Sequence, residues 1–415
     1  MASFVKRVEL LVKTATDQGS LDSEAANALI ALAEQQERER GVLNLGGVLA
    51  RLGGGVVVLG IILLVSANWQ DISDGLKIVG FLILLAGTHG IGLWIRWTDR
   101  PYPRVAEATH FIGAGLFLAG VGLITQIYQL DARPPNTILF WLVAIVPLAV
   151  LLRSAPVTGL AIFALWLWLH MEGSYAGSPV EMSGFGSYLM LSMGIGIALL
   201  GFQTTIGSQE RLIRQAMRGA GVLLLFYSAY VLGFYRHFAA FPADASLHSW
   251  ILPSVVLSLG AIGLAVGWTR LVPESPWLRH RLAILLVLLL VTGAATVAAD
   301  LGALPRGPDL EFFSFGSGIR HFDAAAWLIS IAAWGVWFLL ALWCVAYGTL
   351  RRQKEYMDIG VLGFGLGVVT RFFDLIGGLA ETGTLFLVGG VILLVTAWAM
   401  ERWRRSLVAR IAAAA

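Results

Sequence analysis

Residues 282–299 read LAILLVLLLVTGAATVAA, eighteen consecutive residues without one charged side chain. Coiled as an α-helix at about 1.5 Å per residue, such a run is about 27 Å long, close to the thickness of the hydrocarbon core of a bilayer. Similar runs return along most of the 415-residue chain, separated by short polar stretches. The repetition predicts an all-α fold, a polytopic bundle of transmembrane helices.

The composition agrees with a membrane protein and excludes several other classes. Hydrophobic residues make up 57% of the chain and charged residues only 13%, too few to cover the surface of a soluble protein of this length. The runs are continuous rather than alternating, which argues against a transmembrane β-barrel. The net charge of +3 is not gathered into a basic face interleaved with aromatic residues, so we expect no nucleic-acid partner.

The distribution of basic residues predicts the topology. We expect about twelve spans, at 45–67, 76–96, 105–128, 137–153, 156–171, 184–203, 216–236, 250–269, 281–299, 324–347, 358–379 and 383–401. Loops after even-numbered spans are rich in arginine, as at Arg211, Arg214 and Arg218, whereas loops after odd-numbered spans are poor in it. Because basic loops stay on the cytoplasmic side, both termini are predicted to be cytoplasmic.

Three parts of the chain follow from this pattern. Residues 1–40 carry apolar residues at helical spacing, for example Phe4, Val8 and Leu11, and predict a cytosolic amphipathic helical hairpin. This hairpin would dock on the membrane domain or bind a cytosolic protein. Residues 41–403 form the bundle, with the first run acting as an uncleaved signal anchor, and residues 404–415 are a short cytosolic tail.

Two residue types fall at positions with a structural meaning in membranes. Tryptophans near predicted span ends are expected to act as interfacial anchors, among them Trp94, Trp97, Trp141 and Trp327. Glycines recur at spacings that let helices approach closely, as at Gly113, Gly115, Gly120, Gly363 and Gly367.

One late span carries opposite charges. Residues 368–375, VVTRFFDL, place Arg371 three residues before Asp374, on one helix face. The third predicted span ends in a similar way, with Gln126 and Gln129 at the corresponding positions. Two alternatives follow: a structural pair, with the arginine extending to the interface, or a binding site for an anionic group in which Arg371, Asp374, Gln126 and Gln129 take part.

Further polar residues are expected at the same outer level as this pair. They could ring an extracytoplasmic vestibule or be ordinary polar helix ends, and they are Asn68, His170, Glu172, Arg236, His237 and Asp300.

A second group of ionisable residues lies nearer the cytoplasmic side. Glu107 and His110 are one turn apart on the third predicted span, and His89 lies in the second. A carboxylate and histidines at differing depths could relay protons, although interfacial exposure of Glu107 and ordinary pairing of the histidines are the alternatives. No catalytic, nucleotide-binding or metal-binding motif accompanies them, so we expect no cofactor, no metal and no catalytic residues.

The segments 17–29, 53–78 and 123–157 together resemble the bacterial membrane proteins called domain of unknown function 2157. The positions that carry the resemblance are the Asn68-Trp69 pair at the end of the first span and the element containing Gln126 and Tyr128. The resemblance implies a bacterial polytopic inner-membrane protein and assigns no activity to these residues.

Three classes of function are compatible with the sequence. A transporter or solute-binding membrane protein, taking a small anionic solute or a lipid headgroup, accounts for the charges within spans. A membrane sensor or scaffold would act through the hairpin at residues 1–40. A lipid- or envelope-modifying membrane enzyme would need a reaction centre among the outer polar groups.

Overall fold

The computed structural model describes most of the chain between residues 69 and 376. By its internal contacts the chain divides into two units, residues 1–80 and 81–415. The described ranges are 69–98, 103–130, 133–207, 210–238, 247–273, 275–304, 307–314 and 318–376, with scattered positions within 8–32 and 390–406. Most of the predicted hairpin at 1–40, the spans at 45–67 and 383–401, Asn68 and most of the tail at 404–415 lie outside the described residues.

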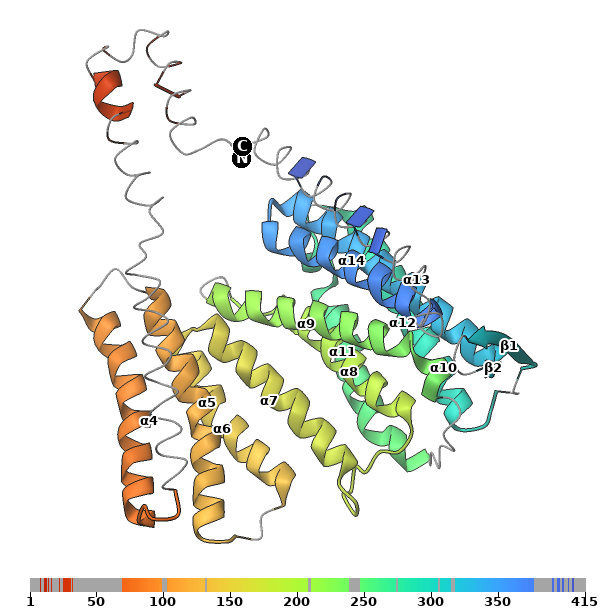
Figure 1. Ribbon diagram of the computed structural model, residues 1–415, viewed down its shortest axis with the longest axis horizontal. Coiled ribbons are helices and arrows are strands. Elements are labelled where there is room, and N and C mark those ends of the chain that lie inside the picture. Colours follow the sequence, from red (N-terminus) through yellow and green to blue (C-terminus); the bar gives the residue numbers. More distant parts are fainter. Residues whose placement is uncertain are drawn as a thin grey trace. The chain divides into compact units, whose positions relative to one another are not determined.

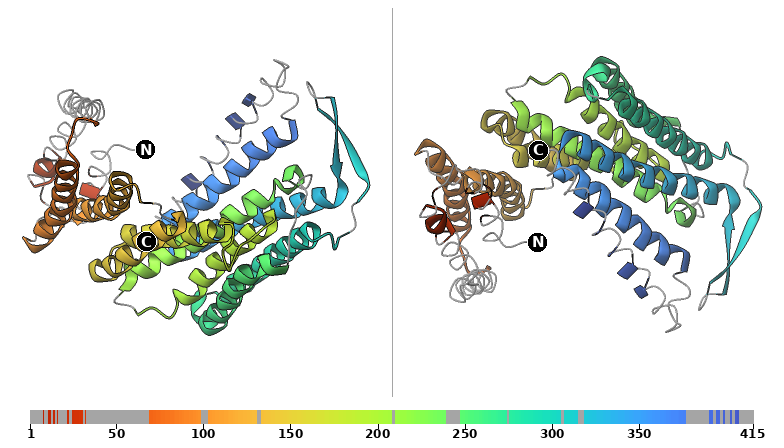
Figure 2. Two further views of the ribbon diagram at one scale, coloured as in Figure 1. Left: turned by 90° about the horizontal axis from the view of Figure 1, so that it is seen from below. Right: turned by 90° about the horizontal axis from the view of Figure 1, so that it is seen from above.

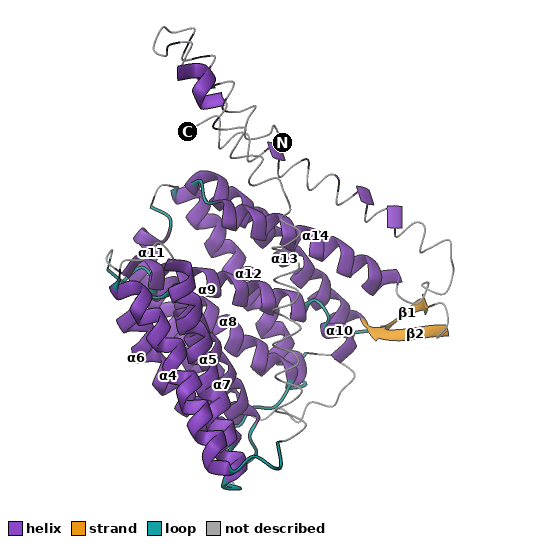
Figure 3. Cartoon of the chain, turned by 60° about the vertical axis from the view of Figure 1, so that its left-hand side comes forward, coloured by secondary structure: helices purple, strands orange, loops and turns teal. Residues whose placement is uncertain are grey.

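Long helices make up nearly all of the described chain (Figures 1 and 3). Their bounds are α4 (Asp74–Trp97), α5 (Pro103–Ile127), α6 (Pro134–Leu152), α7 (Ala155–Ser174), α8 (Phe185–Phe202), α9 (Arg211–Leu232), α10 (Tyr235–Phe238), the 3-10 helix η2 (Leu247–Trp250), α11 (Ile251–Leu271), α12 (Pro276–Asp300), α13 (Ala324–Arg351) and α14 (Lys354–Ile376).

The prediction of a helical membrane bundle is confirmed. Within the described ranges, α4 to α8 and α11 to α13 are eight helices long and apolar enough to cross a membrane. Ten of the predicted spans coincide with α4 to α9 and α11 to α14, with ends that differ by five residues or fewer. The largest correction falls on the span predicted at 216–236, because α9 ends at Leu232 and a new short helix, α10, starts at Tyr235.

Glycines allow α8 and α11 to pack closely against each other. A Cβ atom added at Gly260 would lie 3.1 Å from the carbonyl oxygen of Gly194, and one added at Gly267 would lie 2.8 Å from that of Gly201. Both contacts are with backbone, which cannot move aside as a flexible side chain can. Small residues at such interfaces replace the hydrophobic driving force that lipid removes, because they let backbones pack directly.

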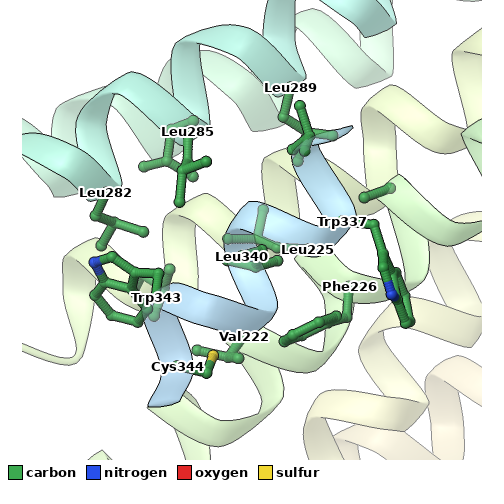
Figure 4. Close-up of a cluster of buried hydrophobic side chains, with 14 of the residues drawn as sticks. Val222, Leu225, Phe226, Leu282, Leu285, Leu289, Trp337, Leu340, Trp343 and Cys344 are labelled. Atoms are coloured by element: carbon green, nitrogen blue, oxygen red, sulfur yellow. The ribbon is translucent and has the colours of Figure 1, made fainter. Parts of the chain in front are cut away.

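The largest buried cluster joins α8, α9, α12 and α13 (Figure 4). Leucines of α12, including Leu282 and Leu289, lie against Leu340 and Trp343 of α13 and Leu225 of α9. The indole Nε1 of Trp343 also donates to the Leu278 carbonyl at 2.9 Å, so the polar edge of this buried ring is satisfied.

A second cluster holds α5, α6 and α7 together and corrects one expectation. Trp141, predicted to be an interfacial anchor, is only 3% exposed and donates from Nε1 to the Ala114 carbonyl at 2.7 Å. Trp97, by contrast, is 90% exposed at the end of α4. A tryptophan near a span end is therefore buried in the bundle when its helix face points inward, and it is free to serve as an anchor only when that face points outward.

A short antiparallel hairpin interrupts the helical pattern. Strands β1 (Asp309–Ser314) and β2 (Gly318–Asp323) pair in the loop before α13 (Figure 2), where the sequence predicted no strand. Its last residue begins the helix, because Asp323 Oδ1 accepts from the backbone N–H groups of Ala325 and Ala326 at 2.7 and 3.0 Å.

Candidate functional site

The arginine of the VVTRFFDL segment lies at the end of another helix. Helix α9 stops at Leu232, and its last carbonyl groups have no partner within the helix. Arg371 of α14 donates from Nη2 to the Tyr230 carbonyl at 2.9 Å and from Nη1 to the Gly233 carbonyl at 3.2 Å. The guanidinium therefore satisfies orphan carbonyl groups and places a positive charge at the negative end of the α9 dipole.

The carboxylate of Asp374 is the centre of a charged cluster. Arg371 Nη1 lies 3.1 Å from Asp374 Oδ2, and Arg236 Nη2 lies 2.7 Å from Asp374 Oδ1. His237 Nε2 is 2.8 Å from the same Oδ1. The cluster of Arg236, His237, Arg371 and Asp374 thus brings two cations and an imidazole onto one carboxylate, contributed by α10 and α14.

Aromatic rings form the walls of this cluster. The Arg371 guanidinium lies 4.0 Å from the ring centre of Phe234, and that of Arg236 lies 4.0 Å from the ring centre of Trp327. Trp334 lies between the two cations, at 5.1 Å from Arg236 and 5.0 Å from Arg371, and donates its Nε1 proton to the Gly233 carbonyl at 2.7 Å. Cation–π attraction of this kind strengthens when the cation is desolvated, as it is here.

The exposure of the side chains increases from the centre of the cluster to one edge. Exposed side-chain fractions are 2% for Arg236, 4% for Asp374 and 8% for Arg371, but 33% for His237. Burial lowers the pKa of Arg236, and the Asp374 carboxylate opposes that shift; the guanidinium stays charged because arginine ionises so far above neutral pH. His237 is the most exposed member of the cluster.

A neighbouring carboxylate fixes the start of another helix. Asp300, the last residue of α12, accepts from the backbone N–H of Gly186 at 2.7 Å and from the Tyr235 hydroxyl at 3.2 Å. Burial and this carboxylate raise the pKa of Tyr235, so its hydroxyl remains a donor. Asp300 therefore caps the N-terminus of α8, just as Arg371 caps the C-terminus of α9.

The glutamines predicted to join Arg371 lie elsewhere. Gln126 and Gln129 are exposed at the end of α5, which packs on α6 and α7, whereas α14 packs on α13. Gln129 has a φ of 47°, the left-handed conformation that ends α5, and the Leu130 N–H returns to the Thr125 carbonyl. The element containing Gln126 and Tyr128 therefore forms the end of α5. Tyr128 is 62% exposed there.

The structure brings together two members of the predicted relay. His89 Nδ1 of α4 lies 3.2 Å from His110 Nδ1 of α5, and His110 is only 1% exposed. Gly92 and Gly113 make room for the pair, because a Cβ at either would collide with one of these imidazoles. Glu107 lies one turn from His110 on α5 and is half-buried.

Sequence reasoning missed the roles of two arginines that tie helices together. Arg133 forms a two-pronged pair with Glu172, at 2.7 and 2.6 Å, and Ser178 donates to the same carboxylate. Hydrogen bonding to Glu172 raises the pKa of Arg133. Glu172 was expected among the outer polar residues, but its partner was not foreseen, and the signal for Arg133 was an arginine in a loop otherwise poor in basic residues.

The second missed arginine is Arg218, near the start of α9. Arg218 of α9 donates to the Tyr347 hydroxyl at 2.6 Å and to Gln203 Oε1 at 3.2 Å. The sequence placed this arginine in a basic loop, where its partners on α13 and beside α8 could not be foreseen.

Trp69 is the described half of the Asn68-Trp69 pair. The Lys77 ammonium lies 5.0 Å from its ring centre.

These helices and their buried polar contacts define the class: a multi-pass helical membrane protein. Residues 15–158 match the model of a family described as "Predicted membrane protein (DUF2157)", which confirms the resemblance seen in the sequence. The match includes α4 to α6, with the His89–His110 pair, and ends before the cluster around Asp374. Comparison with curated proteins and with solved structures returned no match.

Proposed function

We propose that this protein binds an anionic solute or lipid headgroup at the cluster of Arg236, His237, Arg371 and Asp374, and acts as a transporter or solute-binding membrane protein. One observation carries the proposal: two buried guanidinium groups and a half-open histidine converge on a single carboxylate. The cluster is already a carboxylate site, with Asp374 as its resident anion. A carboxylate or phosphate from outside competes with Asp374 for the same donors.

The arrangement of the helices supports placing this site on the extracytoplasmic side. Helices α9 and α14 run parallel, because Phe226 lies beside Gly363 and, further along both helices, Tyr230 contacts Arg371. The predicted topology has both helices running outward. At the opposite end of α9 lies Arg218, in the predicted cytoplasmic loop region, so this part of the bundle fits an inner-membrane protein of a bacterium with both termini in the cytoplasm.

The difference in exposure sets the route of entry. Asp374 and Arg371 are almost fully covered, so a ligand enters from the side of His237.

Binding is tested with the purified full chain in detergent, using inorganic phosphate and acetate as probes. Trp327 and Trp334 contact Arg236, so their fluorescence reports on occupancy. We expect saturable quenching that His237→Gln weakens and that the control His248→Gln, at an exposed histidine of η2, leaves unchanged. Absence of saturable quenching with either probe, or equal binding by the His237 variant, overturns the site.

Access is tested separately in intact cells. Cys344 is buried in α13, and after Cys344→Ser a single cysteine at position 237 is treated from outside with an impermeant maleimide. The proposal requires labelling at position 237 that phosphate or acetate slows. Failure to label there, while a cysteine at the exposed position 129 reacts, excludes an outward-facing entrance.

A further inference from the structure

A groove lies between α12 and α13. It encloses about 350 Å³, and most of its lining is leucine, isoleucine and tryptophan. Ile284, Leu288 and Leu342 line it while remaining 58, 42 and 44% exposed, so the groove opens away from the core. In a membrane protein such a surface is covered by the apolar parts of lipids.

One end of the groove is polar. Arg281 is exposed, and its guanidinium lies 3.9 Å from the ring centre of Trp277, one turn earlier on α12. In the part of the chain that the structure describes, no carboxylate forms an ion pair with Arg281. The tryptophan holds the cation at the rim by cation–π attraction, the arrangement expected at the boundary between headgroups and acyl chains.

The length of the groove matches one leaflet. From Trp277 to Leu288 is eleven residues, or about 16 Å along α12 at the helical rise. Half of a hydrocarbon core is about 15 Å. Helix α12 begins at Pro276, so the polar end of the groove coincides with the end of a transmembrane helix and its apolar part runs toward the middle of the bilayer.

We propose that this groove binds one anionic phospholipid, with its phosphate against Arg281 and an acyl chain along the leucines of α12 and α13. The charge at the rim selects an anionic headgroup, since a basic residue near the headgroups gains from a negative phosphate. The apolar walls and the depth of one leaflet select an acyl chain over a soluble ligand. The site is separate from the cluster around Asp374 and does not depend on the function proposed for it.

The full chain, purified in detergent and stripped of lipid, is titrated with phosphatidylglycerol or phosphatidylcholine, with thermal unfolding and native mass spectrometry as readouts. We expect phosphatidylglycerol to bind with about fivefold higher affinity, the factor for one basic residue near the headgroups. Arg281→Ala removes that preference. Arg211→Ala, at an exposed arginine that starts α9, keeps it.

A second variant tests the apolar part of the groove. Leu288→Trp fills it with a larger side chain, and we expect a bound phospholipid to be lost while the protein remains folded. Equal binding of both lipids by the unaltered protein, or an unchanged preference in Arg281→Ala, refutes the anionic lipid. Retention of lipid by Leu288→Trp refutes the groove as its location, and dimerisation on removing lipid would show that a second copy covers this face instead.

Discussion

Replacing Arg371 by methionine tests whether this arginine holds the bundle together. The variant keeps an unbranched side chain of similar length but removes the charge and every donor. Arg371 is 8% exposed and donates to two carbonyl groups and to Asp374. After the change, Asp374 still contacts Arg236, and the Gly233 carbonyl still accepts from Trp334, whereas the Tyr230 carbonyl loses the Arg371 donor.

The expected cost follows from these partners. Removing one member of a buried ion pair costs about 3–5 kcal/mol, because the remaining charge stays buried. The second contact of Asp374 reduces this loss, and the bared Tyr230 carbonyl adds about 1–3 kcal/mol. We therefore expect Arg371→Met to lower the free energy of unfolding by about 3–5 kcal/mol.

The assay is reversible unfolding of the purified protein in mixed detergent micelles, compared with the control Arg211→Met at an exposed position. The control should stay within about 0.5 kcal/mol of the unaltered protein. Arg371→Lys should fall between the two, since one ammonium cannot reproduce the planar fork that reaches carbonyls and carboxylate together. If Arg371→Met unfolds within about 1 kcal/mol of the unaltered protein, the argument that Arg371 caps α9 is wrong.

Three further changes test other contacts. Gly267→Ala should destabilise the protein by about 1–3 kcal/mol, as overpacking does, in the same unfolding assay that shows Gly115→Ala neutral or stabilising; equal values would contradict the packing of α8 on α11. His89→Phe should cost about 1–3 kcal/mol by leaving the Nδ1 atom of His110 without its partner, and adding His110→Phe should recover part of that loss in a double-mutant cycle; additive losses would show that the rings do not interact. Glu172→Gln should lower the free energy of unfolding by about 1–2 kcal/mol. Because this carboxylate is largely covered, high salt should weaken its pair with Arg133 less than it weakens an exposed ion pair. An unfolding curve of Glu172→Gln identical to that of the unaltered protein would rule out a stabilising pair.

The sequence located the unusual charges but not their partners. Arg371 and Asp374 were recognisable because charges within apolar runs are costly, and their spacing of three residues predicted the contact between them. Arg236 and His237 were identifiable only as polar residues at a similar depth. Their contact with Asp374 depends on the break after α9 and on how α10 and α14 pack. A hydropathy pattern predicts neither feature.

The contact between the two histidines could be predicted from the sequence, whereas the position of the glutamines could not. His89 and His110 lie on helices that are consecutive in the chain, and consecutive helices commonly pack together, so a contact between them was foreseeable. Gln126 and Gln129 were assigned to the Arg371 site through a likeness between two segments, and the structure places them at the end of a helix that packs on other partners.

What the sequence determined by itself was the number of apolar runs, their lengths and the class of protein, since the thickness of the bilayer imposes a helix of about twenty residues on any chain that crosses it. Only the tertiary structure decided which faces meet. Side-chain contacts between helices distant in the chain, such as Arg371 with the end of α9 and Arg218 with Tyr347, depend on the rotation of each helix about its axis. In lipid, apolar faces alone fix that rotation weakly, so small residues and buried polar contacts set it.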